Sequence, residues 1–107
     1  MKGYVYLLHK ASGDIESYKI GISKNDPIKR VKQLQTGNDS SISLLRQYES
    51  ENYKKVERML HKQYHKYSTE SNNEWFNLPD AEVISFIENC KKVDELVSYM
   101  KENNPFF

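Results

Sequence analysis

Three short apolar-rich stretches of the chain predict three strands, and in the second of them apolar and polar residues alternate with a period of two. All three stretches are rich in branched and aromatic residues, and they are residues 3–8, 18–23 and 42–48. The turn formers Ser12, Gly13 and Asp14 lie between the first two. We therefore expect these two strands to pair as an antiparallel hairpin.

Apolar residues spaced by three and four predict helices between and after the strands. The first helix begins after Asp26, at Pro27, because a carboxylate and a proline suit these two positions, and it runs to about Thr36, where Gly37 stops it. Its expected buried stripe is Ile28, Val31 and Leu34. The second helix begins at Ser50 or Glu51, and its stripe is Tyr53, Val56, Leu60, Tyr64 and Tyr67.

The last third of the chain is mainly helical in pattern. Residues 68–73 are expected to form a loop, and residues 74–78 an extended segment that buries Trp75 and Phe76. From Pro79, one bent helix or two helices carry an apolar stripe at positions 83, 86, 87, 90, 93, 97 and 100. These elements predict an α+β fold, with a small three-stranded antiparallel sheet flanked by helices and a C-terminal helical segment over residues 79–104.

Length and cysteine content place the chain in a broad class. With 107 residues we expect a single domain that buries a core without disulfides, and the one cysteine, Cys90, has no partner within the chain. The apolar run near the N-terminus is too short for a signal peptide or a membrane span. We therefore expect a soluble protein of the cytoplasm or another intracellular compartment, with no membrane partner.

Charge is distributed unevenly, although the net charge is only +1. Residues 1–66 have a net charge of +6 and residues 67–107 a net charge of −5. This asymmetry predicts a basic face that binds nucleic acid, and the alternative is a surface that is charged only to stay solvated. The candidate contacts to the phosphate backbone are Lys24, Lys29, Lys32, Lys54, Lys55 and Lys62.

Residues 18–30, YKIGISKNDPIKR, combine a strand, a turn and a helix start. Lys19 and Gly21 share one face of the strand, and the glycine leaves room for a bulky group against the backbone. Arg30 on the helix can hold a phosphate through two parallel hydrogen bonds. The segment therefore predicts a phosphate-binding site.

Glu57 is the acid that changes this picture, because it lies on a basic helix at the border of the apolar stripe. One carboxylate together with phosphate oxygens and water suits Mg²⁺, and the alternative is a surface ion pair. Glu57, His61 and His65 could instead begin a zinc site with His9 or Cys90. They span about 12 Å of helix, however, so we interpret His61 as a boundary residue that forms a hydrogen bond or touches substrate.

Five motifs in order then suggest a family. They are Tyr4-Val5-Tyr6, Lys19-Ile20-Gly21, Arg30, VERMLH at residues 56–61, and EWF at residues 74–76. Together they resemble the GIY-YIG nuclease superfamily, and in particular its viral and phage branch, in which the second motif reads KIG and the later motifs read E-x-x-L-H and E-W-F. The resemblance covers about residues 3–78.

The resemblance implies a role for each matching residue. Tyr6 lines the active site as a base or water-positioning group, and Tyr4 and Gly21 belong to the structural motifs. Arg30 contacts the scissile phosphate, Glu57 binds a single Mg²⁺ or Mn²⁺, and His61 supports the site. Two features depart from the family pattern: the first motif reads YVY, and Lys19 replaces a tyrosine, where it could bind phosphate or act as the base. Asn77 is a candidate for a late asparagine of the family.

The expected function is that of a metal-dependent endonuclease that hydrolyses phosphodiester bonds in DNA, with RNA as the alternative substrate. A non-catalytic nucleic-acid-binding or regulatory module on the same fold is a second hypothesis. A third is a protein-interaction domain that uses residues 80–104 as a docking or dimer face. A homodimer would also matter to the nuclease, because one site with one metal cuts one strand at a time.

Overall fold

The computed structural model describes residues 2–35, 41–69 and 72–104. The side chains of Ser12, Arg30, Leu34, Gln35 and residues 72–74 fall outside this description, as does Gly37, the predicted end of the first helix. The elements in chain order are β1 (Gly3–Ser12), β2 (Ile15–Ser23), α1 (Ile28–Gln35), β3 (Ser41–Ser50), α2 (Tyr53–Gln63), a 3₁₀ turn η1 (His65–Tyr67), β4 (Ser68–Thr69), β5 (Asn72–Phe76), α3 (Asp80–Ile84) and α4 (Phe86–Asn103).

The strands form one five-stranded antiparallel sheet in the order β3-β1-β2-β5-β4. The α+β class is confirmed, and β3, β1 and β2 are the three predicted strands. The sheet continues into part of the predicted loop, because β5 pairs with β2 at Tyr18↔Phe76 and Lys19↔Trp75. Beyond Lys19, that side of β2 has no strand partner among the described residues.

The hairpin between β1 and β2 is as tight as the turn residues predict. Pairing continues to Ser12↔Ile15, so Gly13 and Asp14 alone connect the two strands. Gly13 has a φ of +62°, a conformation that L-residues with side chains rarely adopt. A two-residue loop with positive φ follows the twist of the strands, and it fixes which residues of β1 and β2 face each other.

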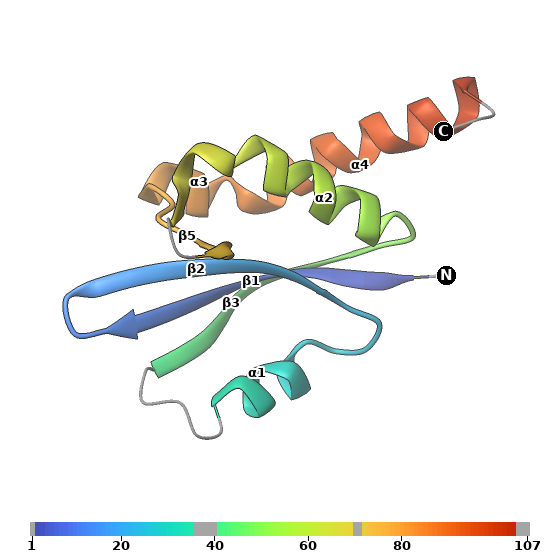
Figure 1. Cartoon of the computed structure of the whole chain (residues 1–107). Helices are drawn as coiled ribbons and strands as arrows, with labels where there is room; N and C mark the ends of the chain where they lie inside the picture. Colours follow the sequence, from blue (N-terminus) through green and yellow to red (C-terminus); the bar gives the residue numbers. More distant parts are fainter. Residues whose placement is uncertain (1, 36–40, 70–71, 105–107) are drawn as a thin grey trace.

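Helices cover the two faces of the sheet unequally (Figure 1). α2 and α4 lie over one face, which we call the α2 face, and α1 lies over the other, the α1 face. The α2 face buries the larger core, to which the sheet, α2, α4 and the segments that join them contribute. Its residues are Val5, Leu7, Tyr18, Ile20, Tyr53, Val56, Leu60, Tyr64, Phe76, Leu78, Phe86, Cys90, Val93 and Val97. The α1 face buries a smaller cluster of Tyr6, Leu8, Val31 and Ile42.

The predicted apolar stripes account for most of this core. In α2, Tyr53, Val56 and Leu60 are buried, and the following Tyr64 is 1% exposed. In α1 the prediction is only partly right, because Val31 is buried whereas Ile28 is 44% exposed. α1 therefore packs on the sheet through Val31, while Ile28 in the same turn faces solvent.

The C-terminal helical region is two helices, and a polar network fastens the second one to the sheet. Asp94 on α4 accepts hydrogen bonds from the Tyr48 hydroxyl at 2.7 Å and from the Asn52 amide at 2.8 Å. Lys101 donates to the side-chain carbonyl of Asn52 at 2.6 Å. Burial and the bond to Asp94 raise the pKa of Tyr48, so its hydroxyl stays a donor.

Among the described residues, no helix is both long and apolar enough to cross a membrane.

Candidate functional site

The space left by Gly21 is filled by the chain itself. Tyr6 and Gly21 are cross-strand partners on the α1 face, and a Cβ added to Gly21 would lie 2.5 Å from the ring and hydroxyl of Tyr6. Tyr6 is only 2% exposed. The bulky group expected against the glycine is therefore the Tyr6 phenol, and the interpretation of this gap as room for a ligand is corrected.

Tyr4, two residues earlier on the same face, has a carboxylate for a neighbour. It pairs across the strands with Glu49 of β3, and the charge of Glu49, together with burial, raises the pKa of Tyr4. Tyr4 is therefore a strand residue whose phenol stays protonated.

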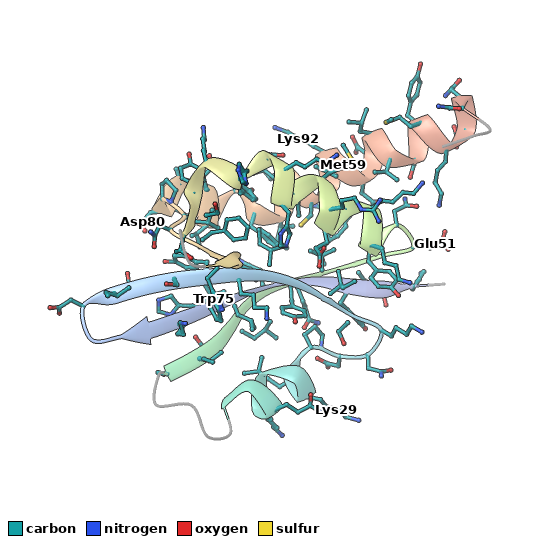
Figure 2. The ribbon with its side chains drawn as sticks, viewed as in Figure 1. Lys29, Glu51, Met59, Trp75, Asp80 and Lys92 are labelled. Carbon is teal, nitrogen blue, oxygen red and sulfur yellow. The ribbon has the colours of Figure 1, made fainter. Side chains whose placement is uncertain are left out.

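Lys19 also lies on the α1 face, next to an aromatic ring. Strand pairing sets it beside Trp75 of β5, and its ammonium is 5.9 Å from the centre of the indole ring. The ammonium of Lys10 is 4.1 Å from the same ring, within the range of a cation–π interaction. Figure 2 shows Trp75 on the α1 side of β2. The prediction that Trp75 is buried was wrong, because it is half-buried between two lysines, whereas Phe76 is 1% exposed on the α2 face.

His61 joins α2 to the edge of β2. Its Nε2 donates a hydrogen bond to the carbonyl oxygen of Ile20 at 2.9 Å, and its ring meets Phe76 edge-on at 5.3 Å. Ile20 directly follows Lys19, where pairing with β5 stops. The hydrogen bond expected of a boundary histidine is present, and it fixes the lateral position of α2 on the sheet.

Glu57 lies one turn before His61 on the same side of α2 and is half-buried. α2 runs antiparallel to β2, because Tyr53 packs against Gly3 near the end of β2, while His61 reaches back to Ile20. Four helical residues advance about 6 Å and two strand residues about 6.6 Å. Glu57 is therefore level with Ile22, beside the part of β2 that has no described strand partner.

The opposite flank of this edge is a hollow of about 330 Å³ between β2 and α1. Its lining residues are Ile22, Ser23, Asn25, Asp26, Lys29 and Gln33. Asp26 accepts a hydrogen bond from the Ile28 amide at 3.1 Å, so it caps α1 as predicted and aims the helix at the end of β2. Arg30 follows Lys29 in α1, and its side chain is outside the described part of the structure.

The sequence-derived site residues are thus divided by the sheet. Tyr6 and Lys19 lie on the α1 face, whereas Glu57 and His61 lie on the α2 side. The two sets approach each other only around the open edge of β2 at residues 20–23. Their arrangement can bind an extended polyanion along this edge, with a carboxylate on one flank and cations on both.

The predicted lysines fall into three groups around this edge. Lys29 and Lys32 are exposed on α1, and Lys24 is exposed just before it. Lys54 and Lys55 lie at the start of α2, where they line a hollow of about 280 Å³ together with Lys101 of α4. Lys62 is exposed farther along α2.

Asn77, the candidate for a late asparagine, follows β5. Its backbone amide donates a hydrogen bond to the Tyr67 carbonyl at 2.8 Å, and its side chain is exposed.

Two residues that line a third hollow were not predicted to bind phosphate. Arg58 and His65 line a space of about 430 Å³ with His61, Lys62 and Phe76. We call this space the α2 hollow. The spacing of 58, 61, 62 and 65 places all four polar residues on one side of a helix, and this pattern could have revealed the site.

The residues present fit a metal with few protein ligands better than a closed metal cage. Among the described residues, no group of three or more His, Cys, Asp or Glu side chains converges on one point. Glu57 with phosphate oxygens and water would suit Mg²⁺ or Mn²⁺. The two further ligands considered for zinc, Cys90 and His9, do not join Glu57 and His61. Cys90 lies in the core, where burial raises the pKa of its thiol to about 12. His9 forms a hydrogen bond with Glu16 at 3.3 Å.

Comparison with known proteins gives one family. The model of the T5orf172 domain matches residues 3–97. A search of curated proteins and a search of solved structures find no significant match.

This match overturns the assignment to the GIY-YIG nuclease superfamily, which was wrong. The physical reason lies in the motifs themselves, because packing alone explains part of them. In the KIG motif, Gly21 leaves the space that the Tyr6 ring occupies. In the E-x-x-L-H motif, His61 forms the hydrogen bond to the Ile20 carbonyl that holds α2 on the sheet. Both motifs are therefore explained in part by the packing of α2 and two strands. The match covers nearly the whole described sheet and its helices, and the chain belongs to the T5orf172 domain family.

Proposed function

We propose that this chain binds nucleic acid, with DNA as the expected substrate, and hydrolyses its phosphodiester bonds with a divalent metal held by Glu57. One observation carries the proposal: Glu57 lies on a basic helix that the 2.9 Å bond between His61 and Ile20 holds against the open edge of β2. A half-buried acid among the cations Lys54, Lys55, Arg58 and Lys62 is a suitable place for a metal that bridges to phosphate.

In this proposal the chain's own groups bind and orient the phosphate. When bound, Mg²⁺ or Mn²⁺ supplies Lewis-acid polarisation of the phosphate and stabilises the leaving oxygen. Arg30, placed by α1 on the other flank of the edge, offsets the negative charge that develops on the non-bridging oxygens. His61 acts as a positioning residue, because it fixes α2 and hence Glu57 relative to β2.

The geometry favours different roles for Tyr6 and Lys19. Tyr6 is 2% exposed and packs on Gly21, which favours a role in packing the two strands over a role as the catalytic base. Lys19 is half-buried at the last position of β2 that pairs with β5. Of the two, Lys19 is the one that can reach a phosphate or a water at the edge, and the proposal assigns the contact to it.

Plasmid nicking tests the proposal. Purified protein is incubated with supercoiled DNA in Mg²⁺ or Mn²⁺, and a parallel sample contains EDTA. We expect metal-dependent nicking that falls by about 100-fold or more in Glu57→Gln and in Arg30→Ala, since each removes charge stabilisation of the transition state. Glu95→Gln, an exposed acid on α4, is the control and should nick at the wild-type rate. Nicking that persists in both site variants contradicts the assignment.

The burial of Tyr6 favours a second candidate, a nucleic-acid-binding module without turnover. In that case the protein binds DNA with strong salt dependence and leaves it intact in every divalent metal tested. The same plasmid assay, combined with a gel-shift measurement, separates the two candidates.

A further inference from the structure

We propose that the α2 hollow is a phosphate subsite that holds the backbone of a nucleic-acid strand at the phosphate next to the one at Glu57. That the phosphate belongs to a nucleic acid rests on the proposed function. That the hollow binds phosphate rests on its own residues, Arg58, His61, Lys62, His65 and Phe76.

The shape of the hollow suits a phosphate with its attached sugar. Its volume is about 430 Å³, and its polar wall is one side of α2 and the turn that follows. Phe76 of β5 forms an apolar floor and is 1% exposed. An apolar floor keeps water away from one side of the hollow, so charges at its rim act more strongly on a bound anion than they would in open solvent.

The charges around the hollow are not neutralised within the described structure. Arg58 and Lys62 are exposed and carry two full positive charges, and His65 is exposed beside them. None of these three side chains forms an ion pair with a carboxylate of another described residue. Cations that stay unpaired on one side of a helix repel one another, and a phosphate between them removes this repulsion.

His61 gives the hollow a fixed wall. Its Nε2 is engaged with Ile20, and its ring is held edge-on to Phe76, so the imidazole cannot swing out with solvent. The hollow therefore combines a fixed side and floor with two exposed cations at the rim. This combination is typical of sites that locate a backbone phosphate without reading the base.

The distance to Glu57 sets the register of the strand. The middle of the four polar positions lies between residues 61 and 62, about 7 Å along the helix from Glu57. Phosphates of one strand rise about 3.4 Å each along the duplex axis, and because the strand winds around that axis, neighbouring phosphates lie about 7 Å apart along the strand itself. A strand that runs along α2 with one phosphate at Glu57 would therefore bring the neighbouring phosphate into the hollow.

The test is DNA binding by the Arg58→Ala/Lys62→Ala double variant. Affinity for a fluorescein-labelled duplex is measured by anisotropy in EDTA at several salt concentrations, so that no metal-dependent cleavage takes place. We expect binding about tenfold weaker than wild type and a slope of log affinity against log salt reduced by about 1, the value for one lost phosphate contact. The matched control is Lys91→Ala/Lys92→Ala, which removes two exposed charges from α4 and should change affinity by less than about twofold.

A second measurement identifies the phosphate source. Inorganic phosphate and thymidine monophosphate are titrated into wild-type protein, and the imidazole proton signals of His61 and His65 are followed by NMR. Saturable shifts that disappear in the double variant, together with its loss of DNA affinity, support the subsite. If the double variant binds DNA as the wild type does, with the same salt slope, the proposal is overturned, even if free phosphate shifts the histidine signals. Because binding is measured without metal, this outcome is independent of whether the protein nicks plasmid.

Discussion

The two faces of the sheet differ in how much they bury. Among the described residues, fourteen buried side chains pack between the sheet and the α2–α4 layer, whereas four pack under α1. Because apolar burial is the main favourable term in folding, the α2 face must supply most of the stability. The α1 face, with less to bury, leaves Lys10, Lys19 and Trp75 accessible. The candidate site lies at the edge where these two unequal layers meet.

The largest expected effect comes from opening the core of the α2 face. Phe86 of α4 is fully buried, and Phe86→Ala should lower the free energy of unfolding by about 3–5 kcal/mol, through lost burial and the cavity that remains. Ile84→Ala, two residues earlier at a position that is 75% exposed, should change it by less than about 0.5 kcal/mol. Urea denaturation of both variants checks the difference, and equal effects would mean that α4 does not close this core.

A smaller effect is expected on the α1 face, where the contact between Gly21 and Tyr6 is close. In Gly21→Ala the new methyl group would lie 2.5 Å from the Tyr6 ring, so the ring must move, at a cost of about 1–3 kcal/mol. Tyr6→Leu removes the obstacle, and the double variant should lose less stability than the two single variants do together. Denaturation of all four proteins gives this coupling energy, expected at about 0.5–3 kcal/mol. Additive losses would show that the two residues do not compete for the same space.

The smallest expected effect is a pH dependence of stability that comes from the buried Cys90 thiol on α4. Burial raises the pKa of the Cys90 thiol from its ordinary 9.0 to about 12, so above pH 9 the thiol ionises in the unfolded chain but not in the folded one. Stability contributed by the neutral thiol is therefore complete below pH 9 and is lost as pH rises toward 12. The stability gap between wild type and Cys90→Ala should shrink by about 1 kcal/mol from pH 7 to pH 10.

The tyrosines titrate in both of these proteins, so comparing the gap at two pH values isolates the thiol. The measurement is urea denaturation at pH 7 and pH 10. A gap that stays constant would mean that water reaches Cys90 in the folded protein.

Local patterns in the sequence were sufficient for the elements but not for their pairing. Gly13 predicts a tight turn, and the Asp26–Pro27 pair predicts a helix start, because each acts on its immediate neighbours. The short β5 joins the sheet through only two residue pairs with β2, far away in sequence, and no periodicity in residues 68–76 indicates them. Trp75 was expected in the core for the same reason, since its place beside Lys19 depends on that pairing.

The candidate site was predictable in its residues but not in its geometry. Glu57 and Lys19 could be selected by type and position, yet the alternation of the strand places Lys19 on the face opposite to α2. The space at Gly21 could be anticipated, but a sequence does not say that a residue of the neighbouring strand fills it. His65 was considered only as a zinc ligand and Arg58 was not selected, although both belong to a mixed basic row on one side of α2.

The bond between His61 and Ile20 also affects how the protein behaves at high concentration. A strand with an unpaired side can add a strand from another molecule, and such pairing leads to aggregation. On β2 the stretch without a described strand partner starts after Lys19, and the first carbonyl beyond it already accepts a hydrogen bond from an imidazole. With α2 anchored there, an incoming strand would have to displace His61 before it could extend the sheet. The same contact that positions the candidate site thus protects the edge of the sheet from self-association.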